Sequence, residues 1–303
     1  MNSSRVLLIM SLAGLAALSP AGCRRPLADS VSYSRSNVAV LRTALGGDKA
    51  ATEATAAVVA DPTGWGTLKG VIKMTGTPPP RKTLNIDKEQ NVCMPGGKPV
   101  LAEDVVVDAS GGIKDVVIYL EKVPADNPKW EHPDYAADKA GSVEFDQKAC
   151  LFLTHVFALR ATQTLDVRNS DPVGHNLNIA GGPRTGNFTV AAGSSQPWLF
   201  GGEAAEPFPV SCGIHPWMSA YGLVRSNPYF AVTNDKGQFE LKNLPAGVPL
   251  KLRVWQERAK FIKEVTATGK IDKFSKGRLE LKLDNDEQRQ LELSAASTLF
   301  GGT

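Results

Sequence analysis

The sequence predicts an all-β protein: a Greek-key β-sandwich or barrel, followed by a small β-rich module. From Trp65 onward the chain consists of short runs of alternating apolar and polar residues, separated by Gly, Pro, Asn and Asp. This pattern is typical of antiparallel sheets. Long amphipathic helical periodicity is not seen, and no internal repeat is evident.

The expected strands follow one another at short intervals. The first covers residues 67–74, with Leu68, Ile72 and Met74 on one face because side chains alternate along a strand. Residues 124–142 form a long polar connection. The other expected strands are 104–107, 114–120, 150–160, 164–168, 176–179, 187–190, 195–200, 207–212, 220–225, 229–233, 238–241, 250–256 and 278–283.

The chain divides into four expected segments. Residues 1–23 have a short head with Arg5 and an apolar run from Val6 to Leu18, which predicts a secretory signal too short to span a bilayer. Residues 24–62, rich in Ala, Ser and Thr, predict a flexible linker. Residues 63–226 form the expected sandwich, and residues 227–303 form the small module.

The export signal and the charge balance limit the partners and the location. Cys23 follows two small residues and resembles a bacterial lipoprotein cleavage site, although Pro20 stands where Leu is usual. We expect a periplasmic, cell-envelope or extracellular protein that contacts the membrane only through a lipid anchor at Cys23. The 34 basic and 31 acidic residues argue against nucleic-acid binding.

Residues 212–218, Cys-Gly-Ile-His-Pro-Trp-Met, place a thiolate, an imidazole and a thioether on one short stretch. His175 lies upstream, after Asn169-Ser170-Asp171-Pro172-Val173-Gly174. Two imidazoles and a thiolate with a weak thioether are the ligands of an electron-transfer copper site. The sequence therefore predicts one copper ion held by His175, Cys212, His215 and Met218.

The cysteines support this interpretation. Besides Cys23, the chain has Cys93, Cys150 and Cys212. In an oxidising compartment Cys93 and Cys150 can pair, which leaves Cys212 free for a metal. The alternative is a structural disulfide between Cys212 and either of the other two.

Residues 63–226 resemble the cupredoxins, the blue type 1 copper proteins. The order His175, Cys212, His215, Met218 is similar to that of plastocyanin-type proteins, and the short Cys-x-x-His-Pro-aromatic-Met loop is similar to that of amicyanin. The stretch 239–247 more weakly resembles carboxypeptidase regulatory-like domains.

The cupredoxin resemblance implies further roles around the ligands. Asn176 and Ser211 would support the ligand-bearing segments. Pro216 and Trp217 would form an apolar rim around a partly exposed His215, where a redox protein partner docks; the alternative is that Trp217 only packs over the loop.

His155 lies among apolar residues and is the reserve ligand, although a core histidine with a hydrogen-bond partner is the simpler interpretation. The predicted function is single-electron transfer by an exported type 1 copper protein that is not an enzyme. A copper oxidase or nitrite reductase needs further histidine-rich copper sites, and the chain has only four histidines. The alternative from another class is a β-sandwich binding or interaction module with a structural or non-blue metal site.

Overall fold

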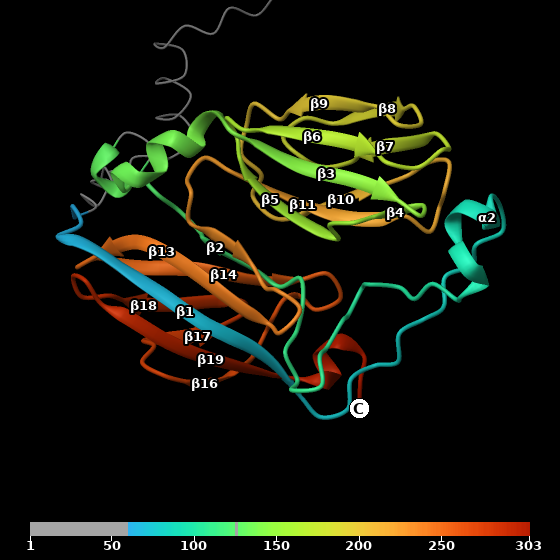
Figure 1. Cartoon of the computed structure of the whole chain (residues 1–303). Coiled ribbons are helices and arrows are strands. Elements are labelled where there is room, and N and C mark those ends of the chain that lie inside the picture. The colour runs from blue at the N-terminus through green and yellow to red at the C-terminus, as the bar shows by residue number, and fades with distance from the viewer. Residues whose placement is uncertain (1–59, 125–126) are drawn as a thin grey trace, which may run out of the picture. The chain divides into compact units, whose positions relative to one another are not determined.

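The computed structural model describes residues 60–124 and 127–303, which are almost entirely β-structure (Figure 1). The predicted all-β class is thereby confirmed. The expected signal 1–23 with Cys23, and the expected linker up to residue 59, lie outside the described residues. Within the described part, no helix has both the length and the apolar character needed to cross a membrane.

One sandwich, here called the host sandwich, is built from both ends of the described chain. Its sheets have the orders β13-β1-β19-β16 and β12-β2-β14-β18-β17, with β15 paired to β14. Its strands are β1 (Gly64–Thr75), β2 (Val117–Leu120), β12 (Phe230–Val232), β13 (Gln238–Ala246), β14 (Pro249–Gln256), β15 (Lys260–Phe261), β16 (Thr266–Thr268), β17 (Lys273–Ser275), β18 (Arg278–Lys282) and β19 (Gln288–Ala296).

The sequence of β1 explains its central place in the host sandwich. Leu68 and Ile72 are fully buried and pack in the same core as Leu291 and Leu293 of β19. Position 70, between them, has to be a glycine, because an added Cβ there would lie 2.3 Å from the carbonyl oxygen of Leu291. β1 pairs with β13 on one edge and with β19 on the other.

A second sandwich, here called the inserted sandwich, consists of β3 to β11. Its sheets have the orders β5-β11-β10-β7-β8 and β4-β3-β6-β9, and they enclose a separate apolar core. Its strands are β3 (Ser142–Lys148), β4 (Leu151–Phe152), β5 (Val156–Arg160), β6 (Thr164–Asn169), β7 (His175–Ile179), β8 (Gly186–Val190), β9 (Ser195–Leu199), β10 (Phe208–Ser211) and β11 (Ser219–Arg225).

The strand pairing does not follow the expected division at residue 226. β2 pairs with β12 and β14, so the inserted sandwich interrupts the host between two neighbouring strands. Phe230 of β12 lies opposite Tyr119 of β2, which brings the two ends of the insertion together. Strands 64–75 and 117–120, expected in the copper domain, thus belong to the sandwich that contains the C-terminal strands.

The two sandwiches contact each other through a small apolar cluster and a buried arginine. Val117, Tyr119 and Trp255 of the host pack with Val156 and Leu223 of the inserted sandwich. The guanidinium of Arg225 donates to the carbonyl oxygens of Leu120 and Glu121 in the host and of Ala204 in the inserted sandwich.

Several expected strands have other forms. The expected strand 150–160 is divided into β4 and β5, which belong to different sheets, and residues 153–155 between them are in no strand. Residues 104–107 make only an isolated bridge from Val107 to Ile113. The polar connection contains short 3-10 helices. The helical turns are α2 (Gln90–Cys93), η1 (Pro95–Gly97), η2 (Pro128–Trp130), η3 (Pro133–Ala140) and η4 (Ser297–Phe300).

Candidate metal centre

The loop 212–218 connects two paired strands at one end of the inserted sandwich. Ser211 of β10 lies opposite Ser219 of β11, so the seven residues between them form the whole connection. The N–H of Cys212 donates to the carbonyl oxygen of Met218 (3.2 Å), and the N–H of Met218 donates to that of His215 (2.9 Å). These bonds fold the loop back on itself and bring its donor residues together.

The neighbouring strand β7 brings the fourth expected donor to this loop. β10 also pairs with β7, where Ser211 lies opposite Asn178. Because the strands are antiparallel, His175 at the start of β7 reaches the level of the loop that follows Ser211. The Nδ1 atoms of His175 and His215 are 2.9 Å apart, and the Cys212 sulfur is 3.9 Å from Nδ1 of His215.

Each of the four expected donors is deeply buried. His175 and His215 are fully enclosed, and Cys212 and Met218 are 2% and 1% exposed in the same apolar core. Donor atoms of His175, Cys212 and His215 all lie within 4.8 Å of one another. The structure therefore brings the two imidazoles and the thiol together, and Met218 is buried in the same apolar core as Cys212.

Two carboxylates hold the far nitrogens of the two rings. Nε2 of His175 is 2.8 Å from Oδ2 of Asp171, and Nε2 of His215 contacts Oε2 of Glu89. An ionised carboxylate only accepts hydrogen bonds, so each ring presents its Nε2–H to its carboxylate. The two Nδ1 atoms then face each other 2.9 Å apart, on the side of the Cys212 sulfur. Carboxylate–histidine pairs of this kind commonly orient metal ligands.

The sulfur of Cys212 has the contacts of a thiolate. Backbone N–H groups of Asn176 and His215 lie 3.3 and 3.4 Å from it. Burial alone would raise the pKa of the thiol, but hydrogen bonds from His175 and from these backbone groups outweigh burial and lower the pKa to about 6. The pKa of His175 is raised, because its bonds to Cys212 and Asp171 outweigh the effect of burial, which lowers it.

Asn176 and Ser211 take different positions beside the donors. Asn176 joins the two donor-bearing segments, because its Oδ1 accepts the N–H of Gly213 (3.1 Å) while its own N–H points to the Cys212 sulfur. Ser211 instead accepts a bond from Asn178 at 3.3 Å.

The expected exposed edge of His215 is not present, and this part of the prediction is wrong. His215 is fully buried because residues 84–101, here called the covering segment, place Glu89 over its Nε2. Pro216 is exposed. Trp217 is half-buried, with its ring centroid 5.1 Å from that of His215, and its indole N–H donates to the carbonyl oxygen of Cys150.

Cys93 and Cys150, the pair expected from the cysteine count, form a disulfide, and Cys212 is a free, buried thiol. His155 is not part of the donor group. Its Nε2 lies 2.6 Å from Oε2 of Glu257 in the host sandwich, so it is a buried histidine with a carboxylate partner.

Of the two carboxylates that the sequence reasoning missed, Asp171 had a visible signal. It lies four residues before His175 and begins the turn that leads into β7. Glu89 had no such signal, because it is 126 positions from His215 and belongs to a connection of the host sandwich.

A thiol beside a His175–Asp171 pair is also the arrangement of a nucleophile with its base. The exposures of Cys212 and His175, 2% and 0%, leave no surface for a substrate to approach. The same three donor atoms are close enough together to hold a metal ion.

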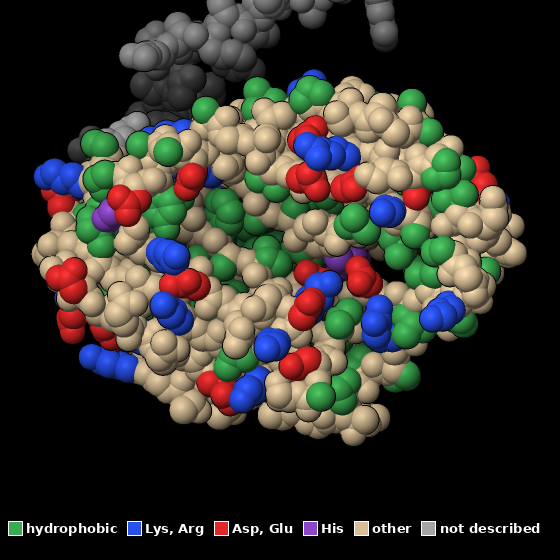
Figure 2. Space-filling view, viewed as in Figure 1, with side chains coloured by type: hydrophobic (Ala, Val, Ile, Leu, Met, Phe, Trp, Pro, Cys, Tyr) green, Lys and Arg blue, Asp and Glu red, His purple; other side chains and the backbone are tan. Residues whose placement is uncertain are grey.

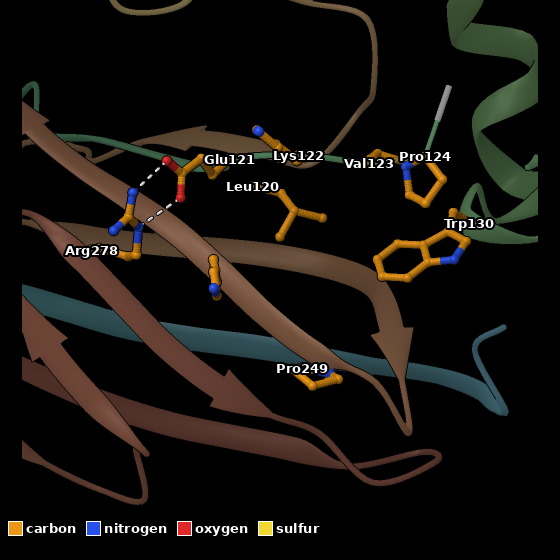
Figure 3. A pocket seen from close by; sticks show the side chains of 9 residues that line it. Leu120, Glu121, Lys122, Val123, Pro124, Trp130, Pro249 and Arg278 are labelled. Carbon is orange, nitrogen blue, oxygen red and sulfur yellow. Dashed lines mark hydrogen bonds and ion pairs between the residues drawn. The ribbon is translucent and has the colours of Figure 1, made fainter. Parts of the chain in front are cut away.

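A separate hollow of about 490 Å³ lies at the host sandwich (Figure 3). It is lined by Leu120, Trp130 and Pro249 and bordered by Glu121, which accepts two 2.7 Å bonds from Arg278. None of the four expected donors lines this hollow. Elsewhere, acidic and basic side chains are interspersed over the face shown in Figure 2.

Comparison with solved structures finds copper proteins, at low similarity. A copper-containing nitrite reductase from Thermus scotoductus SA-01 is 18% identical, with a TM-score of 0.26, over 27% of this chain and 22% of its own. The chain thus spans about a fifth of that protein's length. The reduced Cu(I) form of one amicyanin mutant is 17% identical, with a TM-score of 0.25, over 28% of this chain and 82% of its own. The Cu(I) form of another amicyanin mutant is 16% identical, with a TM-score of 0.26, over 37% and 99%.

These scores are too low to carry an argument about fold or function. No protein-family model matches the chain, and no curated protein matches it. The functional conclusion therefore depends on the geometry of the candidate metal centre.

Proposed function

We propose that this chain is an exported type 1 copper protein that carries single electrons between redox partners of the cell envelope, and that it is not an enzyme. His175, Cys212, His215 and Met218 would hold one copper ion. The two Nδ1 atoms 2.9 Å apart, on rings whose Nε2 atoms face carboxylates, are the observation that supports this proposal most strongly.

The donor set fits copper better than zinc. Thiolate and imidazole suit both ions, whereas a thioether is a poor ligand for zinc and a frequent weak ligand for copper. The low pKa of Cys212, about 6, supplies a thiolate at neutral pH without a strong base. The alternative function, a binding module with a structural or non-blue metal, would not require Met218 in the same core.

The bound copper would supply a one-electron couple, and the chain would hold its donors still while that electron moves. Asn176 fixes the sulfur of Cys212 and the backbone of Gly213 at once. Asp171 and Glu89 fix the orientation of the two rings. The apolar core excludes water, so few groups have to move when the charge changes.

The partner and the location are part of the same proposal. A redox protein would dock near His215 and Trp217, approaching over the exposed Pro216 because the covering segment lies over His215 itself. Export to the periplasm or cell envelope, with an optional lipid anchor at Cys23, would place the protein where such partners meet.

The test is to add Cu(II) to the purified protein and record the visible spectrum and a voltammogram. We expect an intense thiolate-to-copper charge-transfer band and a reversible one-electron wave, both lost in Cys212→Ser. His155→Gln is the matched control and keeps both. A colourless adduct in the wild type would contradict the proposal and favour the alternative.

A further inference from the structure

The covering segment belongs to one sandwich by sequence and to the other by packing. It connects β1 to β2 of the host sandwich, and Figure 1 shows α2 beside the inserted sandwich. Ile86 and Cys93 are buried in the core of the inserted sandwich, where Leu84, Val92 and Val100 pack against it. These contacts are not needed to connect β1 with β2. The role of the covering segment is therefore sought in the residues of the inserted sandwich that it covers.

Glu89 is the residue of this segment that reaches the metal centre. Its carboxylate contacts Nε2 of His215, while its side chain keeps 41% of its surface exposed. Its backbone has φ 49 and ψ 36, a left-handed conformation that is uncommon for residues other than Gly. Residues held in such conformations depend on the surrounding structure to maintain them.

The disulfide supplies that support. The N–H of Cys93 donates to the carbonyl oxygen of Glu89 at 2.9 Å, and Cys93 is bonded to Cys150. The sulfur atoms of this disulfide lie within 4.8 Å of a ring nitrogen of His215. At the other end, the N–H of Cys150 donates to Asp171 at 2.8 Å, the carboxylate that holds His175.

These contacts link the two imidazoles to each other through the disulfide. Glu89 joins His215 to Cys93, and Asp171 joins Cys150 to His175. One connected set of contacts therefore holds both rings, although Glu89 and Cys93 belong to a connection of the host sandwich. Asp171 is local to β7, whereas Glu89 reaches its ring only because the disulfide holds the covering segment in place.

We propose that Glu89 is a positioning residue for the metal-binding imidazole of His215, and that the Cys93–Cys150 disulfide holds it in that role. By accepting Nε2–H, Glu89 keeps the lone pair of Nδ1 free for the metal. Its negative charge makes the imidazole a stronger donor to Cu(II). This inference rests on the proposed function, since it assigns Glu89 a role toward the same site.

The experiment compares Glu89→Ala, Glu89→Gln and Asp87→Asn in the full chain. Asp87 is an exposed carboxylate on the same segment, so its variant is the control for a change of charge. Two properties are measured. The first is the tautomer of His215 in the metal-free protein at pH 8, from nitrogen-15 NMR of the ring. The second is the affinity for Cu(II).

In the wild type and in Asp87→Asn, His215 should carry its proton on Nε2. In Glu89→Ala the tautomers should become mixed, and the Cu(II) affinity should fall by about 10-fold to 100-fold, the usual effect of losing such a partner. Glu89→Gln keeps an oxygen acceptor without the charge, so it should retain the tautomer and lose less affinity. Cys93→Ala/Cys150→Ala should show the mixed tautomers of Glu89→Ala.

Two results would overturn the inference about Glu89. One is an unchanged tautomer in Glu89→Ala; the other is a Cu(II) affinity equal to that of Asp87→Asn. An unchanged tautomer in the double cysteine variant would overturn the role of the disulfide. A wild type without a blue band is a different outcome, which contradicts the proposed function, while the metal-free tautomers still report on Glu89.

Discussion

Asp115 provides a test of the electrostatics where the two sandwiches meet. It is 7% exposed, directly precedes the buried residues that lead into β2, and its Oδ2 has no hydrogen-bond partner among the described residues. Burial raises the pKa of this carboxyl group from 3.8 to about 6, although the charges of Lys114 and His155 act to lower it and those of Glu103 and Asp235 to raise it.

The sign of the effect on stability follows from this raised pKa. Between about pH 4 and pH 6 the native protein keeps a proton on Asp115 that the unfolded chain has already released. The contribution of Asp115 to stability is therefore full below pH 4 and is lost as the pH rises to about 6. The difference between the two pKa values corresponds to roughly 3 kcal/mol at neutral pH.

Asp115→Asn removes this titration and keeps the shape of the side chain. We expect the variant to be more stable than the wild type by up to roughly 3 kcal/mol at pH 7, and equal to it at pH 4. Urea denaturation at both pH values measures the difference. Asp235→Asn is the control, because Asp235 also lies near Lys114 (3.6 Å) but its side chain is 87% exposed. A difference in unfolding free energy between Asp115→Asn and the wild type that has the same size at pH 4 and pH 7 would refute this reasoning.

Two further predictions concern the contacts that hold the sandwiches and the covering segment. The Cys93–Cys150 disulfide closes a segment of 57 positions, so the double alanine variant should lose about 4 kcal/mol of unfolding free energy; an unchanged urea midpoint would contradict this estimate. Arg225→Ala should cost about 3 kcal/mol, because it leaves the buried carbonyl oxygens of Leu120 and Ala204 without their donor. Arg225→Lys should recover only part of this loss in the same assay, since one ammonium cannot reach all the acceptors.

The candidate metal centre could be predicted because its expected donors are close in sequence and chemically distinctive. Three of the four lie within seven residues, and few kinds of site other than a metal centre need a thiolate, an imidazole and a thioether in that order. The same reasoning could have identified Asp171, since it lies four residues before His175 in the turn that leads into β7. The strands β3 and β19 were not among the expected strands, although Val143 and Phe145, like Leu291 and Leu293, alternate with polar residues.

The division into sandwiches was not predictable in the same way. Alternation in β1 shows which side chains face a core, but it does not show which strands lie beside it. The N–H of Trp65 bonds to Asn285, 220 positions away, and nothing local to Trp65 indicates that partner. The contact between Glu89 and His215 has the same character, and for the same reason His215 was expected to be exposed.

The insertion explains why two carboxylates of the host face histidines of the other sandwich. Glu89 comes from the connection before β2 and Glu257 from the end of β14, and they contact His215 and His155 respectively. Because the inserted sandwich leaves and re-enters the host between the paired strands β2 and β12, its position is fixed by the host sheet at both ends. The neighbouring loops of the host can then reach it with defined geometry. A freely linked domain would have to supply the carboxylate beside His215 from its own chain, whereas here a connection of the host sandwich supplies it.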